Sequence, residues 1–140
     1  VITLENMFLE ATSFDGNIGS WDTSSVLNMG EMFYGATSFN QDIGTWDTSK
    51  ANNMFGMFWD AQLFNQDLSK WCVSNILTEP MNFSLNSPLA NENKPLWGTC
   101  PSLIVVSSDL EVLKYGTAYL QIAAFIGPIY PVFFISHAEL

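Results

Sequence analysis

Acidic side chains recur at a fixed spacing along this chain, and they are the first candidates for chemistry. Asp22 recurs as Asp47, and Asp42 recurs as Asp67 after the same interval. If neighbouring copies stack as parallel strands about 4.8 Å apart, their carboxylates repel one another unless hydrogen bonds or a cation compensate. The alternatives are a ladder of Ca²⁺ sites and a set of turn hydrogen bonds and helix N-caps. No glycine-rich calcium-binding nonapeptide is present, which favours turns and caps.

Aromatic and amide side chains recur in the same way. Leu9, Tyr34 and Trp59 hold equivalent places. A row of exposed aromatics would be a recognition surface, whereas the alternative is added packing between copies. Tyr34 and Trp59 are therefore candidate recognition residues. Asn28 and Asn53 predict a buried amide ladder that satisfies backbone groups.

Composition excludes several classes of function. The chain has 14 Asp plus Glu against 4 Lys plus Arg, for a net charge of −10, so it has too few cations to neutralise the phosphates of a nucleic acid. His137 is the single histidine, which excludes His-based catalytic triads and His-rich metal sites in residues 1–102. No phosphate-binding loop occurs. We therefore expect no enzyme activity, no catalytic residues, no cofactor and no resident metal.

An internal 25-residue repeat arranges these candidates. Residues 1–25 and 26–50 are identical at 13 of 25 aligned positions, and residues 26–50 and 51–75 at 11 of 25. A repeat of this length is typical of rungs that stack along one axis. The side chains that recur include Met7, Met32 and Met57; Phe8, Phe33 and Phe58; Phe14, Phe39 and Phe64; and Trp21, Trp46 and Trp71.

Each rung is expected to hold a short helix and a short strand. Leu4, Met7, Phe8 and Ala11 follow the i, i+3, i+4, i+7 spacing of one helix face. Segments such as 43–46 are too short for lone strands but could form a narrow parallel sheet when stacked. The predicted fold is an α/β, leucine-rich-repeat-like solenoid of 25-residue rungs. Its three repeats are 1–25, 26–50 and 51–75.

Residues 76–102 are expected to form a degenerate capping repeat. The match continues through Ile76 and Phe83 and then decays, while Leu89 can take the place of Phe64. Prolines, which discourage both helices and strand pairing, accumulate here. They are Pro80, Pro88, Pro95 and Pro101.

The two cysteines, Cys72 and Cys100, lie at either end of this segment. A disulfide between them would stabilise the domain by about 3.5 kcal/mol in the chain-entropy model. It would also imply an extracellular, periplasmic or ER-lumenal location, and the alternative is two free thiols in a reducing compartment. Asn82-Phe83-Ser84 is a glycosylation sequon, so Asn82 is a candidate glycosylation site in a eukaryotic secretory setting.

The repeat resembles that of BspA-like surface proteins, and more narrowly the class of about 25 residues first described as a mycoplasma domain of unknown function. The resemblance covers residues 1–102 and implies a leucine-rich-repeat-like fold on secreted or cell-surface proteins used for adhesion or recognition. It implies no enzyme chemistry and supplies no agreed binding residues. The matching residues are Met29-Gly30-Glu31-Met32-Phe33-Tyr34-Gly35-Ala36, Phe39-Asn40-Gln41-Asp42-Ile43 and Trp46-Asp47-Thr48-Ser49.

The tail, residues 103–140, lies outside the repeat. Residues 104–106 look like a strand. Residues 116–136 carry no formal charge over a length that would span a bilayer, although Pro128 and Pro131 interrupt them. Three interpretations remain: a membrane anchor, the start of another domain, or an apolar strand or helix packed on the repeats.

We expect a non-catalytic recognition module, secreted or at the cell surface, that binds an unknown protein or glycan. Alternatives are a structural envelope or surface-layer component and a calcium-dependent binding module. No nucleic-acid partner is expected, and membrane contact is expected only through residues 116–136. The chain is predicted to be part of a longer repeat array.

Overall fold

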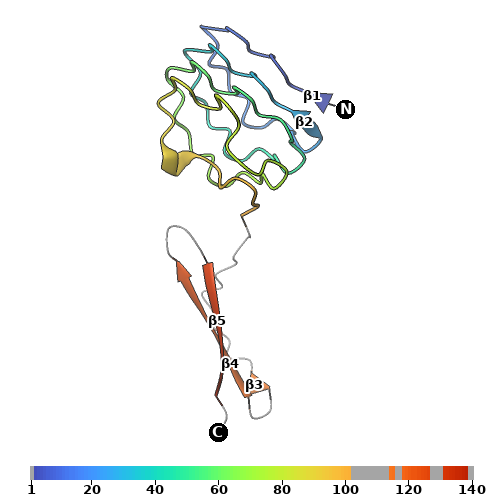
Figure 1. The fold of residues 1–140 in the computed structure, drawn as a ribbon, viewed down its shortest axis with the longest axis vertical. Coiled ribbons are helices and arrows are strands. Elements are labelled where there is room, and N and C mark those ends of the chain that lie inside the picture. The colour runs from blue at the N-terminus through green and yellow to red at the C-terminus, as the bar shows by residue number, and fades with distance from the viewer. Residues whose placement is uncertain (1, 102–113, 116–117, 127–130, 139–140) are drawn as a thin grey trace. The chain divides into compact units, whose positions relative to one another are not determined.

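The computed structural model describes residues 2–101, 114–115, 118–126 and 131–138 (Figure 1). The chain divides into two compact units, Val1–Ser102 and Leu103–Leu140, which are described separately. The elements in chain order are β1 (Ile2–Thr3), β2 (Val26–Asn28), a 3-10 turn (Asn91–Asn93), β3 (Lys114–Tyr115), β4 (Ala118–Ile126) and β5 (Pro131–Ala138).

The predicted α/β solenoid, with a strand and a helix in each rung, is wrong. Residues 2–101 are nearly all turns and coil, and no α-helix occurs among the described residues. Within residues 2–101, a parallel sheet pairs β1 with β2, which places Ile2 opposite Val26 and Thr3 opposite Asn28. Segment 43–46, the expected strand, is a turn in which the Trp46 N–H donates to the Ile43 carbonyl at 3.1 Å.

Left-handed residues explain why the predicted helices do not form. Two residues in each of the stretches 4–11, 29–36 and 54–61 have positive φ, at the third and seventh places, and Asn82 and Asn86 correspond to them in the fourth repeat. A residue with positive φ cannot continue a right-handed helix, so each such residue turns the chain. The residues and angles are Asn6 (59°), Glu10 (53°), Glu31 (51°), Gly35 (68°), Gly56 (56°), Asp60 (56°), Asn82 (59°) and Asn86 (58°).

Backbone hydrogen bonds in these stretches join one repeat to the next. N–H groups at alternate residues donate across repeats, as from Phe8 to the Met32 carbonyl and from Phe33 to the Met57 carbonyl, both at 2.9 Å. The N–H groups between them close local turns, as from Met7 to the Leu4 carbonyl at 3.1 Å. The apolar spacing of Leu4, Met7, Phe8 and Ala11 therefore reflects two successive turns whose buried side chains face one core.

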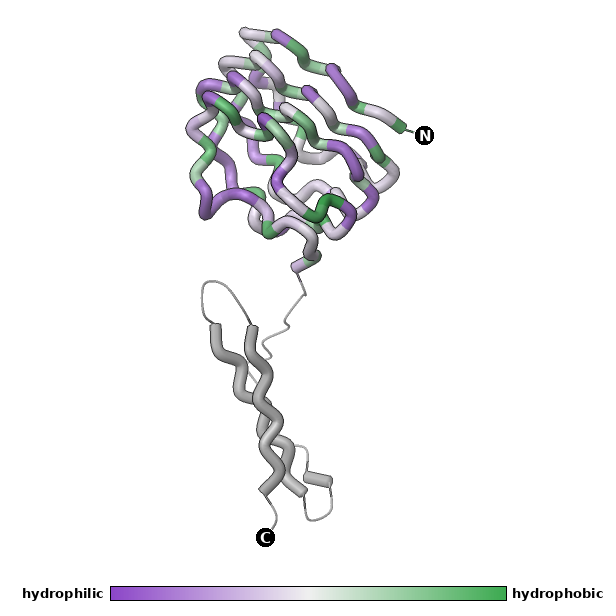
Figure 2. The backbone as a smooth tube through the Cα atoms, viewed as in Figure 1, coloured by the Kyte–Doolittle hydropathy of each residue, from purple (hydrophilic) through white to green (hydrophobic). Residues whose placement is uncertain are grey.

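That core is a set of aromatic ladders that runs from repeat to repeat. Along the turns of the repeats that surround this core, hydrophobic and hydrophilic residues alternate over short distances (Figure 2). Phe33 lies 5.5 Å from Phe8 and 5.6 Å from Phe58 between ring centroids, with nearly parallel rings. Trp46 lies 6.4 Å from both Trp21 and Trp71. The predicted stacking of equivalent side chains from successive repeats is thus confirmed, although the rungs are not strand-helix units.

The fourth repeat, residues 76–101, changes spacing twice. Asp60 and Phe58 donate to the carbonyls of Leu85 and Phe83, which shifts the bonded residue from 24 to 25 places further along. By these bonds Phe83 is equivalent to Met57, one residue off the Phe58 place that a constant spacing predicts, although its ring still packs edge-on against Phe58 at 5.4 Å. The extra residue is lost again before Ala90, whose N–H donates to the Asn65 side chain at 2.9 Å across 25 places, the same separation as in the Asp15–Asn40 and Asn40–Asn65 bonds. Leu89 therefore does take the Phe64 place.

The second compact unit contains a small antiparallel sheet. Its strand order is β3-β4-β5, and β4 pairs with β5 from Tyr119 opposite Ala138 to Ile126 opposite Pro131. Within the described residues, no helix has the length and hydropathy needed to cross a membrane. The predicted strand at 104–106 lies outside the described residues, as do residues 116–117 and 127–130 of the predicted uncharged segment.

Candidate functional site

Four side chains form a row across all four repeats, which we call the recognition row: Leu9, Tyr34, Trp59 and Leu85. The outer members Leu9 and Leu85 are 42% and 45% exposed. Tyr34 and Trp59 are half-buried. Leu9, Tyr34 and Trp59 follow Phe8, Phe33 and Phe58, which pack in or against the core.

Backbone hydrogen bonds hold the row in line. The N–H of the residue after each row member donates to the carbonyl of the next row member. Glu10 donates to Tyr34 at 2.6 Å, Gly35 to Trp59 at 2.8 Å and Asp60 to Leu85 at 2.8 Å. Because these three donors all have left-handed backbone, the turn that positions the row is built the same way in every repeat.

Tyr34 and Trp59 contact each other directly. Their ring centroids are 4.8 Å apart and their planes are tilted by 37°. A Cβ atom at Gly56 would lie 3.3 Å from Glu31 Cγ and 3.7 Å from Trp59 Cε3, so the indole lies over a glycine beside an acidic side chain. A half-buried aromatic pair flanked by carboxylates can stack on a sugar ring or hold an apolar or cationic side chain.

The sequence revealed three members of the row and missed Leu85. A constant repeat spacing pairs Trp59 with Ser84, whereas the structure places Leu85 there because repeat four carries one extra residue before it. A signal was present: Asn82 and Asn86 follow Gly56 and Asp60 by one repeat plus one residue, and all four have positive φ. Asparagine, aspartate and glycine are the residue types that tolerate this backbone best.

The repeated aspartates accept hydrogen bonds from turns. Asp22, Asp47 and Asp67 each accept the N–H two residues on, from Ser24, Ser49 and Ser69, at 2.9–3.0 Å. Asp42 accepts the Gly44 N–H at 2.9 Å in the same way. The predicted turn role is confirmed, and the predicted helix-capping role is wrong because no helix follows these residues.

These hydrogen bonds favour the ionised carboxylates. Side-chain and backbone bonds from Ser49 lower the pKa of Asp47 below 3.8, and Ser24 and Ser69 lower the pKa of Asp22 and Asp67. A backbone bond from Asn40 also lowers the pKa of Asp15. Nowhere in the described residues do three His, Cys, Asp or Glu side chains gather to hold a metal ion. The geometry therefore gives the calcium interpretation no support.

Amide ladders connect the repeats at two further places. The Asn53 Nδ2 donates to Asn28 Oδ1 at 2.9 Å, which confirms the predicted ladder, although both side chains are half-buried. A second ladder was not predicted. Asp15, Asn40 and Asn65 each accept the N–H of the residue 25 places on, at 2.9–3.1 Å.

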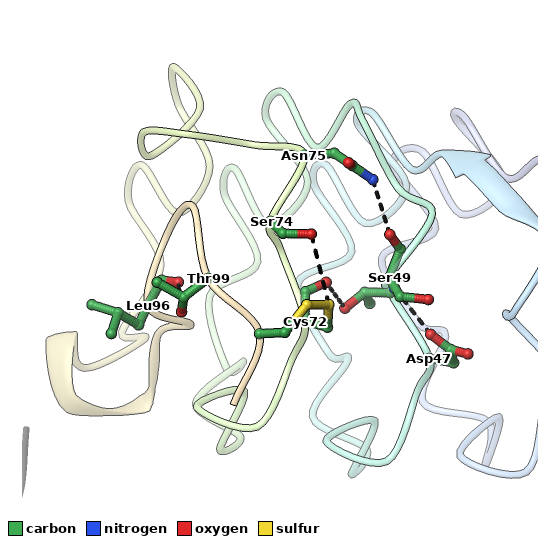
Figure 3. Close-up of a disulfide and its surroundings, with 9 residues drawn as sticks. Asp47, Ser49, Cys72, Ser74, Asn75, Leu96 and Thr99 are labelled. Carbon is green, nitrogen blue, oxygen red and sulfur yellow. Dashed lines mark hydrogen bonds between the residues drawn. A yellow bond between two sulfur atoms is a disulfide. The ribbon is translucent and has the colours of Figure 1, made fainter. Parts of the chain in front are cut away.

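Cys72 and Cys100 form a disulfide, as one of the two sequence interpretations predicted. It ties the end of repeat three to the end of repeat four (Figure 3). Nearby, the Val73 N–H donates to the Thr99 carbonyl at 2.8 Å, and Asn75 Nδ2 donates to the Ser49 carbonyl at 2.9 Å. The covalent link therefore reinforces an edge that is already hydrogen-bonded.

An open depression lies beside Leu85 in repeat four. It has a volume of about 480 Å³, and an ion pair of 2.7 Å between Lys94 and Glu79 lies at its wall. Asn82 also lines it and is half-buried. Glycosylation of Asn82 stays a prediction.

The repeats match a known family. A family model described as "Mycoplasma protein of unknown function, DUF285" covers residues 1–96. The chain belongs to this family. The DUF285 match spans the whole recognition row, and it confirms the predicted resemblance to the mycoplasma domain. No curated protein and no solved structure matches the chain.

Proposed function

We propose that this DUF285 chain is a non-catalytic recognition module of the BspA-like kind, displayed at a cell surface or secreted, that binds a protein or glycan through the recognition row. The observation that carries the proposal is the half-buried Tyr34–Trp59 pair at the centre of a row that crosses four repeats.

Rigidity favours recognition by this row. The carbonyls of Tyr34, Trp59 and Leu85 each accept an inter-repeat hydrogen bond, so little conformational entropy is lost when a ligand binds. Tyrosine and tryptophan also supply large contact areas and are the residue types most enriched at binding hot spots. A row spaced by the repeat suits an extended ligand, such as a glycan chain or a peptide lying across the stack.

The disulfide supports an extracellular setting. Disulfides persist in oxidising compartments and are rare in the cytosol. The single link between Cys72 and Cys100 is therefore expected to form outside the cytoplasm, where a recognition module meets its ligand.

The test compares the Tyr34→Ala/Trp59→Ala variant with the original chain on a glycan array and on an array of purified extracellular-matrix and serum glycoproteins. We expect binding to at least one array and a loss of at least about tenfold in affinity for the variant, as removal of two hot-spot aromatics produces. Leu63→Ala/Leu77→Ala is the matched control, because both leucines are exposed and lie outside the row. Equal binding by both variants, or no binding by the original chain, would overturn the proposal.

A further inference from the structure

The turn pair of repeat four, residues 80–87, presents three backbone N–H groups that donate to no described residue, and we call them the donor edge: Asn82, Ser84 and Asn86. We propose that the donor edge binds a peptide segment of another protein, whose backbone carbonyls accept these N–H groups. This site is distinct from the Tyr34–Trp59 pair, because main-chain groups and not aromatic rings hold its ligand.

The equivalent N–H groups of the three preceding repeats are all bonded to polypeptide carbonyls. At each junction between repeats, three N–H groups at alternate residues donate to the repeat that follows, over distances of 2.6–3.1 Å. Asn82 and Asn86 share the left-handed backbone of Gly56 and Asp60, which are donors at the preceding junction. The donor edge is therefore already shaped to meet carbonyls. The bonded donors are Asn6, Phe8 and Glu10; Glu31, Phe33 and Gly35; and Gly56, Phe58 and Asp60.

The neighbouring backbone groups of repeat four are already used. The N–H groups of Phe83 and Leu85 close local turns on the carbonyls of Pro80 and Asn82, at 3.1 and 3.3 Å. The carbonyls of Met81, Phe83 and Leu85 accept N–H groups from repeat three. The occupant must therefore supply acceptors at alternate residues, as a peptide backbone does when it pairs with an open edge.

The hydrophobic core is closed at this end of the stack. Phe83 and Leu89 are only 1% and 6% exposed. The Trp97 ring packs edge-on against Phe83, with 4.9 Å between the ring centroids. The donor edge therefore lacks hydrogen-bond partners but does not lack a hydrophobic cover, so its occupant needs to supply a backbone and not a further core.

The open depression of repeat four lies at the donor edge. Asn82 and Ser84 line it together with Pro80 and Leu85, and its volume of about 480 Å³ is that of an ordinary ligand pocket. A side chain of the bound peptide can therefore enter the depression beside two of the N–H groups. Met81 and Leu85, which precede Asn82 and Asn86, are 72% and 45% exposed and offer apolar contacts to further side chains of the peptide.

Charge favours a peptide over an anion at the donor edge. Backbone N–H groups can also bind phosphate or carboxylate. However, the chain has a net charge of −10, and Lys94 beside the depression is already paired with Glu79 at 2.7 Å. Asp60 is also close, since its carboxylate accepts a hydrogen bond from Asn86 Nδ2 at 2.8 Å. Neutral carbonyls avoid repulsion by these carboxylates, so we expect a peptide with apolar side chains and no acidic ones.

The experiment selects random peptides displayed on phage against the full chain, produced with its disulfide in a bacterial periplasm. The most enriched peptide is synthesised, and amide hydrogen exchange of the chain is measured by nuclear magnetic resonance with and without it. Without peptide, we expect the three N–H groups of the donor edge to be at least about tenfold less protected than that of Phe58, which is hydrogen-bonded. With peptide, we expect their protection to rise at least about tenfold.

Two tryptophan variants test the depression. Ser84→Trp fills it, because Ser84 is one of its lining residues. Ser13→Trp is the matched control, since Ser13 is an exposed serine in repeat one. We expect Ser84→Trp to weaken peptide binding at least about tenfold and Ser13→Trp to leave it unchanged, because only the first indole takes the space of a ligand side chain. The exchange measurement on the original chain depends on neither variant.

Three results would overturn the proposal. If the donor edge is as protected as Phe58 without peptide, it is already occupied. If selection enriches no peptide, or only peptides that protect other amide groups, the edge is not a peptide site. If inorganic phosphate alone protects the three N–H groups equally, the edge is an anion site. The Tyr34→Ala/Trp59→Ala variant should bind the selected peptide unchanged, so failure here is distinguishable from failure of the proposed function.

Discussion

Asp22, Asp47 and Asp67 show how one residue type serves the same local purpose in successive repeats. Each carboxylate accepts the N–H two residues on and so closes a turn that no regular secondary structure supports. The sequence predicted this role from residue type and spacing alone, because Asp is a turn former in any context. Whether a turn or a helix follows depends on the residues further along the chain.

The charge of Asp47 gives the fold a pH dependence. Its hydrogen bonds with Ser49 lower its pKa below 3.8 in the folded chain. As pH falls, the Asp47 carboxylate is therefore protonated in the unfolded chain at a higher pH than in the folded chain. This contribution to the free energy of unfolding is therefore complete above about pH 5 and lost as pH falls through the folded-state pKa. Asp47→Asn keeps the accepting oxygen but has no charge to titrate.

We expect the free energy of unfolding in urea to fall less between pH 7 and pH 3 for Asp47→Asn than for the original chain. The difference should be less than about 1 kcal/mol, because solvent screens this exposed group. Asp42→Asn is the control, because Asp42 accepts a similar backbone bond from Gly44 but has no serine hydroxyl two residues on. If the free energy of unfolding fell equally with acid in Asp47→Asn and in the original chain, Asp47 would not be the source of this pH dependence.

The turn pairs of residues 4–11, 29–36 and 54–61 are the elements that sequence periodicity misread. Their apolar spacing fits a helix, yet four of the six residues at the left-handed positions of these pairs are Asn, Gly or Asp. Period alone cannot separate a short helix from two successive turns, because both bring the same residues to one face. Asn6, Gly35, Gly56 and Asp60 were the signal for turns.

Glu31 tests this element directly, since it is an ordinary residue held at a φ of 51°. Glu31→Gly and Glu31→Ala both remove the carboxylate and differ only by one Cβ atom. We expect the glycine variant to be more stable than the alanine variant by about 1 kcal/mol, because Cβ is strained in the left-handed region. The measurement is the free energy of unfolding by urea.

The same pair of substitutions at Lys50 is the control, because Lys50 does not have positive φ. There the alanine variant is expected to be equal or better, since glycine gains entropy in the unfolded chain. If alanine were also the better residue at position 31, the left-handed turn would not be present in solution.

Across the whole stack, the sequence predicted which residues lie over one another but not how the chain connects them. Identical side chains at equivalent places of successive repeats must share an environment, so the aromatic ladders followed from the repeat alone. Repeat four departs because one residue is added before Asn82 and one is lost before Leu89. The backbone hydrogen bonds establish those shifts, at which Asn82 and Asn86 hint in the sequence, and with them the place of Leu85 in the recognition row.

The disulfide is expected to stabilise this stack as a whole. It closes a loop between residues 28 apart, and the chain-entropy model assigns such a loop about 3.5 kcal/mol. We expect the Cys72→Ser/Cys100→Ser variant to have a free energy of unfolding, measured in urea, about 3 kcal/mol lower than that of the original chain.

The same variant should expose the Val73 N–H, bonded to Thr99, to hydrogen exchange before it exposes the Phe33 N–H, bonded to Met57. Adding dithiothreitol to the original chain is the matched comparison. Equal stability of the oxidised and reduced chains would show that repeat four holds its place without the link.

Repeats one and two meet through the same backbone bonds as repeats two and three, with each donor reaching the equivalent carbonyl of the repeat that follows. A gene encoding such a protein could therefore gain or lose the codons of one whole repeat in frame and leave the contacts on either side of the seam intact. Recombination between near-identical copies would then vary the length of the molecule, and with it the number of aromatic groups in its outer row, without a redesign of its interior.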